Sequence, residues 1–134
     1  MKINIDHELD TETVLFKTSG NIVISEVKPF ITVSSNQVDE LKKLVDRYIV
    51  GDFGFISIRS KKNEISINPS IWDDVFKKVP NICAFALLTN SEISTKNFIY
   101  IEKPVIEMYR KGFPAGVFDN LEAAYRWVSN QIGK

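Results

Sequence analysis

The segment Ile82–Leu88 reads Ile-Cys-Ala-Phe-Ala-Leu-Leu and contains no polar side chain. A strand with one face in water alternates apolar and polar residues, so an unbroken apolar run bounded by Pro80-Asn81 and Thr89-Asn90-Ser91 indicates a strand covered on both faces. We therefore expect Ile82–Leu88 to be the central strand of a sheet.

Two segments before it have the composition of paired strands. Thr13–Thr18 and Asn21–Val27 are rich in β-forming residues and are joined by Ser19-Gly20-Asn21, which supplies turn chemistry, so they predict an antiparallel hairpin. Residues 1–12 are polar and carry four acidic side chains, which predicts a loosely ordered lead-in or a short edge strand. Further extended segments are expected at Phe53–Arg59, Ile65–Ile67 and Ala115–Phe118.

Helices are predicted between these strands. In Asn36–Val50, apolar residues recur at intervals of three and four while charged residues occupy the other face, and Gly51 follows. Asn68-Pro69-Ser70 is a favourable helix start before the stripe that contains Trp72 and Val75. A last helix is expected from the capping-box pattern of residues 119–122, with Asp119 as the cap, to about Gln131.

The segment Ser91–Lys111 allows two interpretations. Phe98, Ile101, Val105 and Met108 fall at intervals of three, four and three, which indicates one buried helix face. Pro104, however, would cost a regular helix interior about 3 kcal/mol. Either a helix kinks at Lys103, or residues 97–101 are extended and a helix begins at Pro104; we favour the kinked helix.

The order of these elements predicts an α/β (mixed α+β) fold. A hairpin followed by alternating helices and strands is typical of a single-layer mixed sheet, here packed by about four helices, with strand Phe53–Arg59 parallel to Ile82–Leu88. The 134 residues, 44% of them hydrophobic and 25% charged, are those of one globular domain spanning residues 1–134.

Composition and charge exclude several function classes. Lysine plus arginine equal aspartate plus glutamate at 17 each, so no long-range field attracts nucleic acid or an anionic membrane. The N-terminal residues contain no apolar signal region, and no stretch approaches the roughly 18 apolar residues of a membrane span, so we expect a cytoplasmic protein. Cys83 lies within the apolar run and is expected to be a buried, inert thiol.

The residues of common catalytic and cofactor sites are missing from the sequence. The six glycines form neither a dinucleotide-binding nor a P-loop pattern. With one histidine, His7, and one cysteine, neither a zinc site nor a Ser-His-Asp or Cys-His pair can be assembled, and His7 is expected to be solvated. We therefore expect no metal, no cofactor and no catalytic residues.

A site, if present, is expected at the carboxyl ends of the parallel strands, where ligands bind in open α/β sheets. Candidate ligand- or partner-binding residues at these ends are Arg59, Ser60, Asn90, Ser91 and Asp119. Arg59 can hold an anion or a carboxylate through two parallel hydrogen bonds, although a surface salt bridge is the simpler interpretation. Trp72 and Trp127 lie on or beside buried stripes and are expected in the core.

The chain resembles the SpoIIAA-like group of the STAS superfamily, as a small stand-alone protein of the STAS/SEC14 type. The resemblance rests on the hairpin 14–27, on Phe53–Arg59, on Ile82–Leu88, and above all on the ending Val-Phe-Asp-Asn-Leu-Glu-Ala-Ala-Tyr-Arg-Trp-Val of residues 117–128. It implies a regulatory interaction module. Anti-sigma antagonists of this superfamily carry a phosphorylatable serine in an Asp-Ser-Ser-Gly motif, which is absent here; Ser60 and Ser91 are the nearest candidates by position.

Two functions remain as hypotheses. The first, implied by the resemblance, is a non-catalytic module that binds a protein partner or a small apolar or anionic molecule, with a possible homodimer through an edge strand or the hairpin. The second is an enzyme of unrecognised class that uses Arg59, Asn90 and Asp119, which predicts that these side chains converge in one pocket. The missing catalytic residues favour the binding module.

Overall fold

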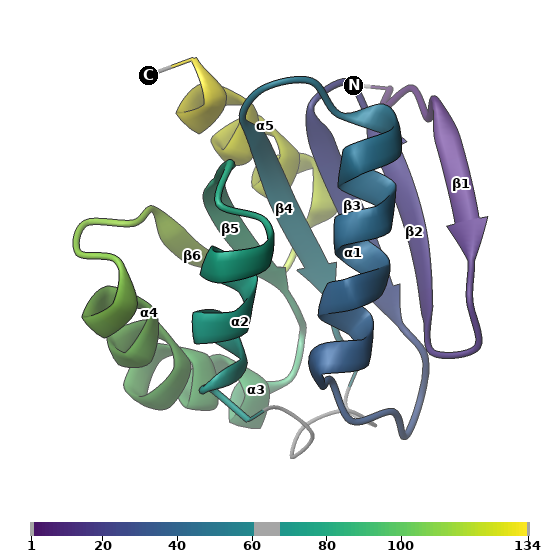
Figure 1. Ribbon diagram of the computed structural model, residues 1–134. Coiled ribbons are helices and arrows are strands. Elements are labelled where there is room, and N and C mark those ends of the chain that lie inside the picture. Colours follow the sequence, from purple (N-terminus) through teal and green to yellow (C-terminus); the bar gives the residue numbers. More distant parts are fainter. Residues whose placement is uncertain (1, 61–67, 134) are drawn as a thin grey trace.

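The protein, described by a computed structural model over residues 2–60 and 68–133, contains a six-stranded sheet in the order β1-β2-β3-β4-β5-β6 (Figure 1). The short strand expected at Ile65–Ile67 lies outside the described residues. The strands are β1 (His7–Asp10), β2 (Val14–Ser19), β3 (Ile22–Val27), β4 (Phe53–Ile58), β5 (Ile82–Leu88) and β6 (Ala115–Phe118). The helices are α1 (Ser35–Tyr48), α2 (Ile71–Lys78), α3 (Glu92–Asn97), the π-helical turn η2 (Phe98–Glu102), α4 (Lys103–Tyr109) and α5 (Leu121–Ile132).

The sheet is mixed, which confirms the expected fold class. β1, β2 and β3 are antiparallel, and β3, β4, β5 and β6 are parallel. The predicted hairpin is β2–β3, in which Ser19 pairs with Ile22 across the turn. Of the two interpretations of the first residues, the edge strand is correct for His7–Asp10, which pairs with β2 and exposes all four of its residues.

β5 is an interior strand, flanked by β4 and β6, rather than the middle strand of the sheet. Its apolar composition is explained by burial on both faces, since Phe85 and Leu87 face one hydrophobic cluster and Ala86 faces the other. The chain from β4 through α2 to β5 forms a parallel crossover unit, as expected.

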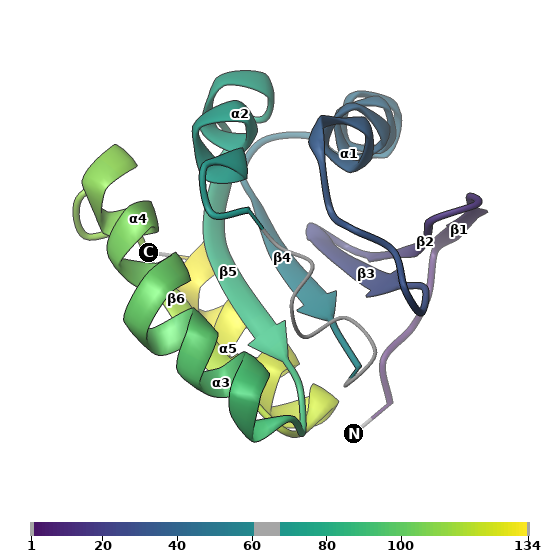
Figure 2. The same ribbon diagram turned by 90° about the horizontal axis from the view of Figure 1, so that it is seen from below.

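Helices cover both faces of the sheet, α1 and α2 on one and α5 on the other (Figure 2). The contact between α5 and β4 is close because Gly54 has no side chain. A Cβ atom at Gly54 would lie 2.1 Å from Cγ1 of Val128, so any larger residue requires α5 to shift.

The chain from Glu92 to Tyr109 is helical throughout, so the helical interpretation of this segment is correct. It contains the π-helical turn η2 directly before Pro104, closed by the Lys103 N–H donating to the Phe98 carbonyl. A π turn holds one extra residue, which accommodates the proline and rotates every later side chain around the axis. Consequently the buried face is not the predicted one: Phe98 is buried, but Ile101 and Met108 are exposed. The residues that do point inward are Ser94, Phe98, Glu102 and Ile106.

Two helix boundaries differ from the prediction. Ser34 caps α1 with a capping box that includes Gln37. Asn120, not Asp119, caps α5, since its side chain accepts a hydrogen bond of 3.0 Å from the Ala123 N–H. Within residues 2–60 and 68–133, none of the helices has both the length and the apolar character needed to cross a membrane.

Candidate functional site

The carboxyl ends of β4, β5 and β6 lie along one edge of the sheet, as expected, but the candidate residues there do not form one site. Backbone hydrogen bonds join Arg59 to Leu88 and Thr89 to Phe118, at 3.0 and 2.9 Å. Asn90 and Asp119, like Ser60, are exposed at the surface.

The other two candidates point into the protein. Ser91 is almost fully buried, and its hydroxyl caps α3 by accepting from the Ser94 N–H at 3.2 Å. Arg59 is buried as well, so the expectation of a surface salt bridge is wrong: its ion pair is formed in the interior.

Arg59 is the centre of a buried polar cluster. Its guanidinium donates two parallel hydrogen bonds to the Glu102 carboxylate, with nitrogen–oxygen distances of 2.9 and 3.1 Å. Its Nε donates to the Ser57 hydroxyl at 3.2 Å, and the Trp72 indole N–H donates to Glu102 Oε1 at 2.9 Å. The guanidinium also lies 5.7 Å from the centre of the Phe85 ring. Every residue of the cluster is at most 9% exposed. The carboxylate that Arg59 binds is therefore that of Glu102 and not that of a ligand.

Strand periodicity places Arg59 in this cluster. Phe53, Phe55, Ser57 and Arg59 alternate along β4 and its extension, so all four side chains face α1 and α2. Glu102 comes from the π turn η2 and meets Arg59 because it lies four residues after Phe98, on the buried face of the helix. Sequence reasoning missed Glu102; the available signal was its position four residues after Phe98, on the same face of the predicted helix.

A small apolar cavity lies next to this cluster, between the sheet and helices α1 and α2. Its volume is about 50 Å³, several times the roughly 10–15 Å³ that one water needs. Gln37, Ser25, Ser57 and Arg59 contribute the polar part of its wall. The apolar wall is formed by Val14, Phe16, Val27, Val33, Val38, Leu41, Phe55, Ile71, Trp72, Val75 and Phe85.

An ion pair links the two helices that cover the cavity. Lys78 of α2 lies 2.5 Å from Asp39 of α1 and 3.2 Å from Asp74 of its own helix. The hydrogen bond to Asp39 raises the pKa of Lys78 above its usual value, so the lysine stays charged throughout the neutral range. The α1–α2 contact over the cavity is therefore partly electrostatic.

A second, wider groove lies on the opposite face of the sheet. It has a volume of about 280 Å³ and is bounded by Ile3 and Ile5 of the N-terminal segment and by Leu121 of α5. Its floor consists of side chains from β2, β3 and β4, namely Leu15, Lys17, Ile24, Glu26 and Ile58. Because Lys17 and Glu26 bring charge into it, this groove is more polar than the cavity.

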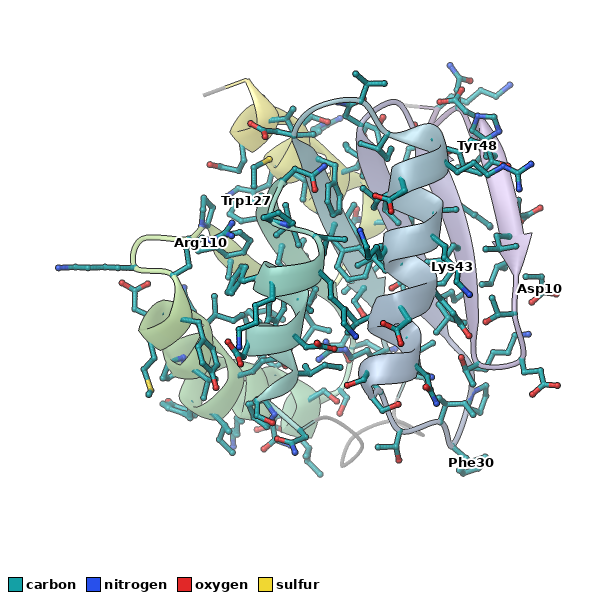
Figure 3. All side chains as sticks on the ribbon, viewed as in Figure 1. Asp10, Phe30, Lys43, Tyr48, Arg110 and Trp127 are labelled. Atoms are coloured by element: carbon teal, nitrogen blue, oxygen red, sulfur yellow. The ribbon has the colours of Figure 1, made fainter. Side chains whose placement is uncertain are left out.

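The remaining chemistry-bearing residues lie apart from the cavity. The His7 ring stacks on Tyr48 with ring centres 3.8 Å apart, at the end of α1 beside β1, where Figure 3 shows Tyr48. Cys83 is only partly buried, so the expectation of a fully buried thiol is wrong, although partial burial raises the pKa of this thiol above its usual value. Within residues 2–60 and 68–133, no three His, Cys, Asp or Glu side chains gather at a possible metal site.

Comparison of the chain with models of known protein families and with curated proteins finds no match to either.

Proposed function

We propose that this protein is a non-catalytic binding module of the STAS type, and that the cavity between the sheet, α1 and α2 receives the apolar end of a small molecule. The cavity itself carries the proposal, because its space of about 50 Å³ between the sheet, α1 and α2 is lined mainly by aliphatic and aromatic side chains. The antiparallel hairpin followed by parallel strands also supports the STAS resemblance.

The size of the cavity limits the ligand. Pockets that enclose a whole drug-sized molecule typically begin at about 300 Å³. The cavity is much smaller, so it takes a short apolar group while the rest of the ligand lies outside. The Arg59 guanidinium is already paired with Glu102, so an apolar group fits this space better than an anion.

The arrangement supports binding rather than catalysis. Arg59 lines the cavity, whereas neither Asn90 nor Asp119 does, so the three residues of the enzyme hypothesis share no wall of it. Ser91, one of two candidates for phosphorylation, is buried as a helix cap. As part of the proposal we place the module in the cytoplasm, where a single unpaired thiol such as Cys83 is usual.

Native mass spectrometry of the gently purified protein tests the proposal, followed by titration with an uncharged fluorescent naphthylamine. We expect a retained extra mass or saturable dye binding. Val38→Leu places one more methylene group in the cavity and should weaken binding several-fold while the protein remains folded. Val50→Leu is the matched control, because Val50 is 88% exposed and the same change should leave binding unaltered.

Two results contradict the proposal. If the protein retains no extra mass and does not bind the dye, the cavity does not bind a small apolar ligand. Binding that survives Val38→Leu but is lost on Ile24→Ala, in the opposite groove, places the ligand on the wrong face of the sheet.

A further inference from the structure

The outer face of the helix from Glu92 to Tyr109 carries an apolar stripe. Its members are the four large apolar side chains of this helix that are more than half exposed, Ile93, Tyr100, Ile101 and Met108, at 54%, 74%, 51% and 81%; Ile99 and Tyr109 are 43% and 44% exposed. The π turn produces this exposure, because an uninterrupted α-helix with Phe98 buried would also turn Ile101 and Met108 inward. The buried positions are taken instead by Glu102 and Ile106.

The spacing of the stripe is symmetric about its midpoint. Ile93 lies seven residues before Tyr100, and Met108 lies seven residues after Ile101. When two copies of the helix pack antiparallel about a two-fold axis between Tyr100 and Ile101, Ile93 faces Met108 of the second copy and Tyr100 faces its Ile101. A two-fold interface requires such self-complementarity, because the same patch serves both subunits.

From this symmetry we propose that the stripe is the contact surface of a homodimer, formed by antiparallel packing of the Glu92–Tyr109 helices of two copies. Charges at the rim fit the same arrangement. Lys96, which pairs with Glu92 of its own helix at 3.1 Å, comes within one helical turn of Glu107 of the second copy in the antiparallel register, twice by symmetry. The net charge of zero adds no long-range repulsion between copies.

The edge strand at the opposite end of the sheet is a poorer contact. β1 exposes Glu8 and Asp10. If the β1 strands of two copies paired with each other, these like charges would lie together across the strand pair. The helix stripe therefore replaces the edge strand and the hairpin as the proposed dimer contact. It is independent of the cavity, whose walls contain none of its residues.

Sedimentation velocity of the full chain, from about 1 µM to several hundred µM, spans the range of weak to moderate dimers. We expect a reversible monomer–dimer equilibrium. Met108→Lys and Ile101→Lys each place two charges in the contact and should weaken dimerisation about 100-fold, with an unchanged circular dichroism spectrum because both side chains are exposed. Val50→Lys, at an equally exposed valine outside the stripe, should leave the equilibrium unchanged.

Cysteine cross-linking tests the register. In a Cys83→Ala background, Tyr100→Cys lies next to the two-fold axis and should form a disulfide-linked dimer on oxidation, whereas Val50→Cys should not. A wild-type protein that stays monomeric over the whole range overturns the proposal. So does a dimer that persists in both lysine variants, or one that is cross-linked through Val50→Cys and not through Tyr100→Cys.

Discussion

The Arg59–Glu102 pair should be worth far more to stability than an ion pair at the surface. The perturbation is Glu102→Gln, which preserves the shape of the side chain but removes its charge. The guanidinium then keeps its position with an amide opposite it, and its charge is unpaired in a site where both side chains are at most 9% exposed. An unpaired charge there has lost its hydration without a counter-charge in return.

The magnitude follows from the contacts. Breaking a buried ion pair by removing one partner costs about 3–5 kcal/mol. We expect the lower value, about 3 kcal/mol, because the amide oxygen still accepts from the Trp72 indole N–H. Replacing both Arg59 and Glu102 by methionine leaves no unpaired charge. This double variant should therefore be at least 2 kcal/mol more stable than the summed losses of the two single methionine variants predict.

Urea unfolding followed by tryptophan fluorescence measures these differences, because Trp72 is buried in the same cluster. With a slope of about 1.5 kcal/mol per molar urea, the midpoint should fall by about 2 M. Asp46→Asn is the control, since it breaks the exposed Lys42–Asp46 pair at 3.1 Å and should cost less than about 0.5 kcal/mol. A Glu102→Gln variant no less stable than Asp46→Asn would refute the reasoning, because it would mean that water already screens the buried pair.

Three further predictions concern packing, capping and the thiol. Gly54→Ala should destabilise the protein by about 1–3 kcal/mol through contact with Val128, a loss that Val128→Ala should partly reverse in urea unfolding. Asn120→Ala should cost about 1 kcal/mol in the same assay and Asp119→Ala under about 0.5, and equal losses would contradict the assigned cap. Because burial raises the pKa of Cys83, alkylation at about pH 8 should be slower in the folded than in the unfolded protein, and equal rates would contradict its burial.

The raised pKa of Cys83 also sets the sign of a pH effect on stability. The unfolded chain ionises this thiol at lower pH than the folded protein does. The stabilisation is therefore complete below the ordinary pKa of 9.0 and is lost as the pH rises through the higher pKa of the folded state. The urea midpoint should fall at alkaline pH, and Cys83→Ala should remove the part of this fall that Cys83 causes. If the fall is unchanged in Cys83→Ala, other groups cause it.

The sheet could be predicted from the sequence because its signals are local. Ser19-Gly20-Asn21 places the hairpin turn, and the apolar composition of Ile82–Leu88 requires cover on both faces. The position of β5 beside the last strand could not be predicted in this way, since strand order depends on contacts between distant segments. Asn120 and Asp119 are both good caps by residue type, and only backbone geometry distinguishes them.

The buried cluster could not be predicted because its two charged residues come from segments far apart in the chain. Periodicity along β4 does turn Arg59 inward with Phe55 and Ser57, yet an arginine at a strand end is more often at the surface. Its partner Glu102 lies four residues after Phe98 on the buried face of the helix, but an acidic residue is rarely fully buried unless it is paired. Helical periodicity assumes a regular helix, so it selected Ile101 and Met108 for burial instead.

The helix from Glu92 to Tyr109 thus had two possible registers, and Pro104 favours the one that contains the π turn. A regular α-helix would bury Ile101 and Met108, each worth about 1.5–3 kcal/mol of transfer free energy. It would also place Pro104 in its interior, at a cost of about 3 kcal/mol. The π turn avoids this penalty at the expense of exposing two apolar side chains, and it keeps Glu102 on the buried face, where it pairs with Arg59. Burial of the apolar stripe between two copies would recover the apolar surface that the π turn exposes.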